Sequence, residues 1–264
     1  MEKNMAATRL VSQTPLKPYQ RAILIGASSG IGAALAQKLA DEGYQLALLG
    51  RRESLLETLC TQINTKHGEK RAISFVHDVT QIDDVPTLFN KVVAELGGLD
   101  AIIYNAGILE VVKLNEFDPK KDIEMTQINY LGALAWLNPA AAYFQGVKSG
   151  QIVGLGSVAG DRGRVGAPAY NASKAALHTY LEALRNRLTR HGINVLTIKP
   201  GFVATDMIKD NPRTPMVISP EKAADGIFKA MQARKQTVYV PAQWGLLMQI
   251  IRHIPSIIFR RLTF

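Results

Sequence analysis

The chain has 264 residues, a single cysteine and a formal net charge of +9. This length suits one large α/β domain with a substantial core, and a lone cysteine excludes an intramolecular disulfide and a cysteine-based metal site. The five histidines are scattered without the spacing of metal ligands, so we predict no metal centre. Cys60 falls in a predicted helix at residues 55–63, where we expect it to pack against apolar neighbours.

Residues 1–19 form a polar segment that we predict to be flexible. It has no continuous apolar run of the length that a secretory signal needs, and with the unpaired cysteine this predicts a cytoplasmic protein. We therefore divide the chain into a flexible segment at 1–19, one folded domain at 20–242 and an amphipathic C-terminal extension at 243–264.

The first part of the domain has the pattern of a strand, a glycine-rich turn and a helix. Residues 21–25 are an apolar run, and residues 33–40 are rich in apolar helix formers. The spacing G-x-x-x-G-x-G between them predicts a tight turn and a helix N-terminus, whose unpaired N–H groups and dipole suit a pyrophosphate. The alternative is a turn that only packs the strand on the helix. The phosphate-binding interpretation selects Gly26, Ser28, Ser29, Gly30, Ile31 and Gly32.

Further strand-like runs alternate with helix-like segments along the chain. This alternation, with short connections, predicts a doubly wound parallel sheet. The runs occupy residues 45–49, 72–77, 101–104 and 194–199. Polar or glycine-containing sequences follow each of them: Gly50, Arg51 and Arg52; Asp78 and Val79; Asn105, Ala106 and Gly107; and Pro200, Gly201, Val203 and Thr205.

Tyr170 and Lys174 are four residues apart, which on a helix places both side chains on one face. A tyrosine with a pKa of about 10 exchanges protons poorly at neutral pH, and lowering that pKa by about three units takes roughly 4 kcal/mol. A fixed cation beside the phenol can supply this stabilisation. The spacing alone is also compatible with two solvated side chains.

Taken together, these motifs resemble the short-chain dehydrogenase/reductase family over roughly residues 20–240. Two further matches lie in the same order: Asn129 in a long central helix, and Ser157 within the sequence Gly-Ser-Val-Ala-Gly at residues 156–160. The resemblance implies a Rossmann-like fold with a mainly parallel seven-stranded sheet and helices on both faces. The C-terminal extension would add a hydrophobic helical segment.

The resemblance also implies catalytic roles. Tyr170 would be the general acid in carbonyl reduction and the base in alcohol oxidation, and Lys174 would lower its pKa and hold the nicotinamide ribose. Ser157 would hydrogen-bond the substrate oxygen, and Asn129 would hold a water that links Lys174 to solvent. The structural alternatives are that Ser157 caps a turn and that Asn129 satisfies backbone groups where the helix kinks.

Cofactor contacts follow from the same resemblance. Asp78 would reach the adenine amino group and the Val79 amide the ring, while residues 105–107 line the cofactor and Thr205 contacts the carboxamide. Tyr104 departs from the family pattern, which often has asparagine there. This departure leaves the wall beside the adenosine undetermined by the resemblance, without affecting the family assignment.

The choice between the two nicotinamide cofactors depends on the end of the second strand. An NAD site usually has an acid there, whereas this chain has Arg51 and Arg52. Guanidinium groups can pair with a ribose 2′-phosphate, so we predict NADP(H), with Arg51 as the main contact and a hydroxyl from Ser28. The alternative is a helix start with solvated arginines.

The substrate prediction depends on the segment from residue 202 to residue 219, which follows Pro200-Gly201. Its apolar side chains, with Ile108, Leu109 and Val158, suit a small-molecule carbonyl or alcohol with an apolar body. We predict reduction of a ketone or aldehyde, because a cofactor with the 2′-phosphate is usually kept reduced in cells. The alternatives are an alcohol dehydrogenase working oxidatively and a non-catalytic nucleotide-binding protein.

The C-terminal extension mixes large apolar side chains with basic ones. Residues 226–264 carry six Lys or Arg side chains and no acid. Nothing there resembles a nucleic-acid module, and the segment is too short and interrupted to span a bilayer. Three interpretations remain: contact with an anionic membrane surface, a lid on the substrate cleft, or an arm on a neighbouring subunit. The resemblance favours a homodimer or homotetramer.

Overall fold

The computed structural model describes residues 20–110, 112–208 and 215–262. The predicted flexible segment at 1–19 lies outside the described residues. A parallel sheet runs through the centre, in the order β3-β2-β1-β4-β5-β6-β7. Its strands are β1 (Arg21–Ile25), β2 (Gln45–Gly50), β3 (Ala72–Val76), β4 (Ala101–Tyr104), β5 (Gln151–Leu155), β6 (Asn194–Pro200) and β7 (Thr237–Val240).

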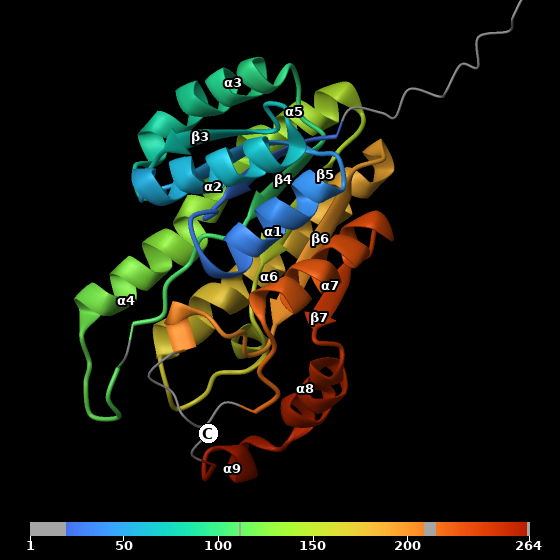
Figure 1. Cartoon of the computed structure of the whole chain (residues 1–264). Coiled ribbons are helices and arrows are strands. Elements are labelled where there is room, and N and C mark those ends of the chain that lie inside the picture. Colours follow the sequence, from blue (N-terminus) through green and yellow to red (C-terminus); the bar gives the residue numbers. More distant parts are fainter. Residues whose placement is uncertain (1–19, 111, 209–214, 263–264) are drawn as a thin grey trace, which may run out of the picture.

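Helices cover both faces of the sheet (Figure 1). One layer consists of α1 (Gly30–Asp41), α2 (Glu53–His67) and α7 (Pro220–Gln232). The other consists of α3 (Val85–Leu96), α5 (Gly132–Val147) and α6 (Pro168–Leu188).

Alternation along β1 shows why both layers form. Ala22 and Leu24 pack into the core on one face, whereas Ile23 and Ile25 pack into the core on the other. A strand with both faces covered is apolar throughout, which is why its sequence is a continuous apolar run. The predicted Rossmann-like, doubly wound fold is confirmed.

The predicted central helix is interrupted. It comprises α4 (Pro119–Thr126), a π-helical turn (Gln127–Leu131) and α5. Such turns widen the helix by one residue and often occur at functional sites. Asn129 lies within the turn, so its place in the helix is irregular.

The C-terminal extension packs against its own chain (Figure 1). It forms α8 (Gln243–His253) and the short α9 (Ser256–Phe259). Trp244 and Met248 are buried against Val158. The Arg162 guanidinium donates to the carbonyl of Ile254 at 2.6 Å and lies 3.8 Å from the centre of the Phe259 ring. These contacts tie the extension to the loop that follows β5.

Among the described residues, no helix is both long and apolar enough to cross a bilayer. The extension nevertheless leaves apolar side chains in solvent. Leu246 and Ile250 on α8, and Ile257 and Ile258 on α9, are all more than half exposed.

Candidate active site

A cavity of about 920 Å³ lies where the carboxyl ends of the strands meet. In a parallel sheet these ends form one edge, and ligands of such folds bind there. Of the residues selected from the sequence, all but Gly32 and Asn129 line the cavity: Gly26, Ser28, Ser29, Gly30, Ile31, Arg51, Arg52, Asp78, Val79, Asn105, Ala106, Gly107, Ser157, Tyr170, Lys174, Pro200, Gly201, Val203 and Thr205.

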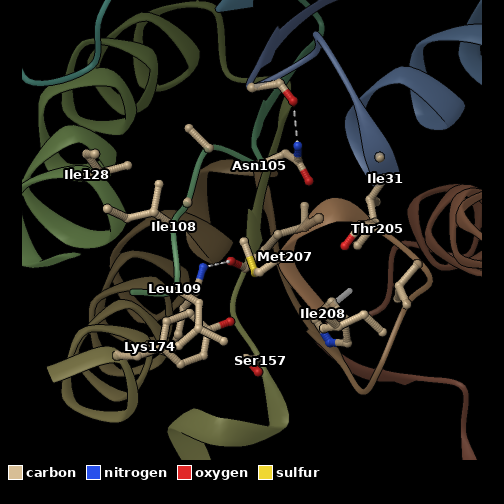
Figure 2. Close-up of a pocket in the computed structure, with 18 of the residues that line it drawn as sticks. Ile31, Asn105, Ile108, Leu109, Ile128, Ser157, Lys174, Thr205, Met207 and Ile208 are labelled. Atoms are coloured by element: carbon tan, nitrogen blue, oxygen red, sulfur yellow. Dashed lines mark hydrogen bonds between the residues drawn. The ribbon is translucent and has the colours of Figure 1, made fainter. Parts of the chain in front are cut away.

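The glycine turn after β1 has no room for side chains at two positions. Gly26 has a φ of 84°, and a Cβ on it would lie 2.6 Å from the Ala106 nitrogen. A Cβ on Gly32 would lie 2.0 Å from the Gly26 oxygen. The side-chain amide of Asn105 donates to this same oxygen at 2.6 Å, so the turn is joined directly to the residue that follows β4 (Figure 2).

Helix α1 begins at this turn with its N-terminus at the cavity. Ser29, its N-cap residue, makes no side-chain cap hydrogen bond. The first N–H groups of a helix have no partner within the helix, and the helix dipole adds positive potential there. A helix N-terminus of this kind could hold the pyrophosphate of a dinucleotide, and that role of the turn stays a prediction.

The two arginines after β2 have different surroundings. Arg52 donates to the hydroxyl of Ser28 at 2.8 Å and to that of Ser29 at 2.6 Å. Arg51 is 56% exposed, and its nearest carboxylate oxygen, on Asp78, is 3.8 Å away. Both arginines line the cavity, but Arg52 is the one that lies against the glycine turn.

Asp78 is held as a carboxylate. Burial alone would raise its pKa, but the Thr80 amide and hydroxyl donate to it at 3.0 and 2.9 Å, and Arg51 adds positive charge. Together these interactions keep the pKa of Asp78 below its usual value. Asp78 can therefore accept a hydrogen bond from a ligand at neutral pH.

Tyr104, where the chain departs from the family pattern, is not among the residues that line the cavity. It is fully buried, and its hydroxyl donates to the Ile128 carbonyl at 2.5 Å. Burial raises the pKa of this phenol, so it stays protonated as a donor. Ile128 precedes Asn129 in the π-helical turn, so the Tyr104 hydroxyl is bonded directly to that turn.

The Asn129 side chain is bonded to the loop after β4. Its Oδ1 accepts from the Ile108 amide at 2.8 Å, and its Nδ2 donates to the Ile108 carbonyl at 3.0 Å. Nδ2 also donates to the Ser173 hydroxyl at 3.2 Å. Asn129 thus does satisfy backbone groups beside a helix irregularity, which was the structural alternative. In doing so it fixes Ile108 in the cavity lining.

Ser157, Tyr170 and Lys174 converge on the cavity from the end of β5 and from α6. Lys174 is 4% exposed, and its ammonium donates to the Leu155 carbonyl at 3.0 Å (Figure 2). It lies 5.8 Å from the centre of the Tyr170 ring. The Ser157 hydroxyl accepts from the Ala159 amide at 3.1 Å, so it also caps the turn Val158–Asp161.

The pKa of Tyr170 differs from the sequence prediction, in which Lys174 lowers it. Burial raises the pKa of Tyr170, and Ser157 and Arg164 offset part of that rise. Burial lowers the pKa of Lys174 to about 8. The Lys174 ammonium donates to the Leu155 carbonyl, and burial destabilises its charged form, so Lys174 is not among the groups that lower the pKa of Tyr170 here.

Comparison with known proteins identifies this arrangement. The family model for short chain dehydrogenases matches residues 20–215. The chain belongs to the short-chain dehydrogenase family. Members of this family are oxidoreductases that use nicotinamide cofactors on small-molecule substrates.

Two curated relatives of this short-chain dehydrogenase illustrate the match. An "Uncharacterized oxidoreductase" of Myxococcus xanthus is 31% identical over 91% of this chain and 95% of the relative. One of Listeria monocytogenes is 35% identical over 71% of this chain and 75% of the relative.

Solved structures show the same fold. A short-chain type dehydrogenase/reductase from Mycobacterium marinum superposes with a TM-score of 0.76 at 26% identity, covering 83% of this chain and 93% of the other. A short-chain dehydrogenase from Sphingobium yanoikuyae, solved with NADPH, superposes with a TM-score of 0.78 at 22% identity, covering 90% and 97%.

A buried polar network behind Ser157 was not selected from the sequence. The Ser157 amide donates to the His178 ring nitrogen Nε2 at 3.3 Å, and burial lowers the pKa of His178 to about 3, so the ring is neutral. Asp161 accepts from Lys199 at 2.5 Å and from the Tyr239 hydroxyl at 2.6 Å. His178 could have been predicted to lie near the site, because it is eight residues after Tyr170 and so falls on the same side of the helix.

Proposed function

We propose that this short-chain dehydrogenase is an NADPH-dependent carbonyl reductase that acts on a ketone or aldehyde with an apolar body. The observation that carries the proposal is the single cavity that holds both the glycine turn and the Ser157, Tyr170 and Lys174 side chains. When bound, the nicotinamide would supply the hydride, so the protein needs only to orient the carbonyl and provide a proton.

The proposed roles of the side chains are those that the family resemblance implies. The Ser157 hydroxyl would bind the carbonyl oxygen as negative charge develops on it. Tyr170 would donate the proton to that oxygen, and Lys174, which also lines the cavity, would hold the nicotinamide ribose. The water-holding role of Asn129 stays a prediction, since its side-chain amide is bonded to Ile108 and Ser173.

Reduction is favoured over the alcohol dehydrogenase alternative by the proposed cofactor, because a nicotinamide with the 2′-phosphate is usually kept reduced in cells. In that direction the Tyr170 hydroxyl would act as the acid. The non-catalytic alternative is disfavoured because Ser157, Tyr170 and Lys174 all line one cavity.

The choice of NADP(H) is supported by the basic groups at the end of β2. Arg51, Arg52 and Ser28 line the cavity together, and β2 ends in Gly50 followed by these two arginines, with the first acid only at Glu53. Two similar structures were solved with matching ligands: NADPH in the Sphingobium yanoikuyae enzyme and 5-hydroxy-NADP in the Thermococcus sibiricus alcohol dehydrogenase. Because Arg52 already contacts both serines of the turn, we assign it the main 2′-phosphate contact in place of Arg51.

An apolar substrate body is supported by the lining beyond Ser157. Leu109, Val158, Met207 and Ile208 line this part of the cavity (Figure 2 labels Leu109, Met207 and Ile208). Such surface binds hydrocarbon by removing it from water. Residues 209–214 of the predicted substrate segment lie outside the described residues. A polyketide ketoreductase with NADPH has the same fold, with a TM-score of 0.78 at 24% identity.

The C-terminal extension is proposed to have two functions. Its buried residues contact Val158 and Phe202, which both line the cavity, so the extension would support the substrate wall. Its exposed apolar side chains lie near Arg252, Arg260 and Arg261, a composition that suits the surface of an anionic membrane. The proposed domain limits and a homodimeric or homotetrameric assembly are retained from the sequence.

We expect Tyr170→Phe to abolish nearly all turnover of apolar ketones while NADPH still binds with unchanged affinity. The substitution removes the proton donor but leaves the glycine turn intact. Turnover is followed by the loss of NADPH absorbance and binding by fluorescence titration. Near-normal turnover in this variant would exclude the assigned role of Tyr170.

We expect Arg52→Gln to weaken NADPH binding about tenfold or more, because a hydrogen bond to a charged group is worth roughly 1.5–3 kcal/mol. NADH, which lacks the 2′-phosphate, should bind with little change. Arg190→Gln removes the same charge at an exposed position outside the cavity and serves as the control. Equal affinity of the native protein for NADPH and NADH would refute the cofactor assignment.

We expect the full chain to sediment with vesicles that contain phosphatidylglycerol and to stay in the supernatant with pure phosphatidylcholine. The double substitution Leu246→Gln and Ile250→Gln, at two exposed positions of α8, should abolish the sedimentation without unfolding the protein. If the native chain ignores the anionic vesicles, the membrane function is wrong.

A further inference from the structure

Arg164 is a cationic group in the cavity to which the proposed reaction assigns no role. It lies in the loop between the turn Val158–Asp161 and α6, and it lines the cavity together with Gly166, Ala167 and Tyr170. Its side chain is partly buried. A guanidinium remains charged at any physiological pH and carries five N–H donors.

The loop that carries Arg164 is fixed relative to Tyr170. Asn171, the next residue in α6, is 4% exposed and donates to the backbone carbonyls of Arg164 at 3.3 Å and Gly166 at 3.0 Å. Since Asn171 and Tyr170 are adjacent on one rigid helix, the base of the Arg164 side chain is held at a set place beside the proton donor.

Within the described part of the chain, no hydrogen bond or ion pair connects the Arg164 guanidinium to another group. Other arginines of this region do have partners: Arg162 donates to the carbonyls of Ile251 and Ile254, and Arg185 to the Val195 carbonyl. Glu110 also lines the cavity, and among the described residues no ion pair joins it to Arg164.

The unpaired guanidinium carries a desolvation cost. Burial lowers the pKa of Arg164, and the nearby Tyr170 acts in the opposite direction. A charge that is removed from water without a partner destabilises the fold. Such a group is expected either to act on Tyr170 alone or to receive its partner from a ligand.

We infer that Arg164 binds an anionic group of the substrate, a carboxylate or a phosphate, so that the enzyme reduces an amphiphilic oxo acid or oxoalkyl phosphate. This inference rests on the proposed carbonyl reductase function. The planar guanidinium matches both anions with two parallel hydrogen bonds. The apolar body of the same substrate lies against Val158, Met207 and Ile208, which line the cavity with Arg164.

The experiment compares matched substrates on matched variants. The substrates are straight-chain methyl ketones of graded length that end in a carboxylate, the methyl ester of each, and oxoalkyl phosphates of the same lengths. The proteins are the full-length native chain, Arg164→Gln, Arg164→Lys, and Arg190→Gln as a control for the loss of charge. Steady-state kinetics with saturating NADPH give kcat and KM for each pair.

We expect the native protein to prefer the anionic member of at least one pair by about tenfold or more in kcat/KM. Arg164→Gln should remove that preference mainly by raising KM for the anionic substrates, with a much smaller change for the esters. Arg164→Lys should restore part of the preference, and Arg190→Gln should behave like the native protein. The preferred anion, carboxylate or phosphate, identifies which of the two groups the substrate carries.

Two results would overturn the inference while leaving the reductase function intact. One is a native protein that reduces each ester as well as its acid. The other is an Arg164→Gln variant in which both members of a pair change equally and the pH profile shifts, because Arg164 would then act only on Tyr170. If the native protein reduces none of these ketones, nor an apolar ketone without a charge, the proposed function itself fails.

Discussion

The buried ammonium of Lys174 is the interaction on which the arrangement of this site depends. Its hydrogen bond to the Leu155 carbonyl joins α6 to the end of β5, and a Cβ on Gly107 would lie only 3.2 Å from the same nitrogen. One charged atom therefore meets the end of β5, the loop after β4 and the helix that carries Tyr170. Burial lowers the pKa of Lys174 to about 8, which still leaves the amine mostly charged at neutral pH.

The glycines beside this ammonium make the close packing feasible. A Cβ on Gly160 would lie 2.7 Å from the Lys174 carbonyl carbon, and one on Gly156 would lie 2.1 Å from the His178 ring. The loop after β5 can therefore lie directly on α6, which brings Ser157 to the same cavity as Tyr170. Arg162, in the same loop, holds the C-terminal extension, so the catalytic loop and the extension are parts of one wall.

Much of this could be predicted from the sequence because it depends on local patterns. The alternating apolar runs predicted the parallel sheet, the glycine spacing predicted the turn after β1, and the four-residue spacing placed Tyr170 and Lys174 on one helix face. Contacts between distant segments were not predictable. The Tyr104 hydroxyl bonds to a carbonyl of the π-helical turn, which the sequence does not predict. Arg52 bonds to Ser29, which lies 23 residues earlier in the chain.

Arg164 and His178 escaped sequence reasoning for the same reason. Both residues reach the site only because the loop after β5 packs on α6. This packing places Arg164 in the same cavity as Tyr170 and His178 against the Ser157 amide. The prediction that Lys174 lowers the pKa of Tyr170 is opposed by burial, which raises the pKa of Tyr170 and lowers that of Lys174. Helix spacing places the two side chains near each other, but it gives no measure of how strongly burial opposes the charge on each.

The most direct test of this account is the pH dependence of hydride transfer in a single turnover with NADPH. With the native protein, the rate of ketone reduction should fall as the pH rises through about 8, where Lys174 loses its charge. In Lys174→Met the rate at neutral pH should be lower by about 100-fold or more, and the fall near that pH should disappear. A variant that keeps both the native rate and the native pH profile would contradict the account.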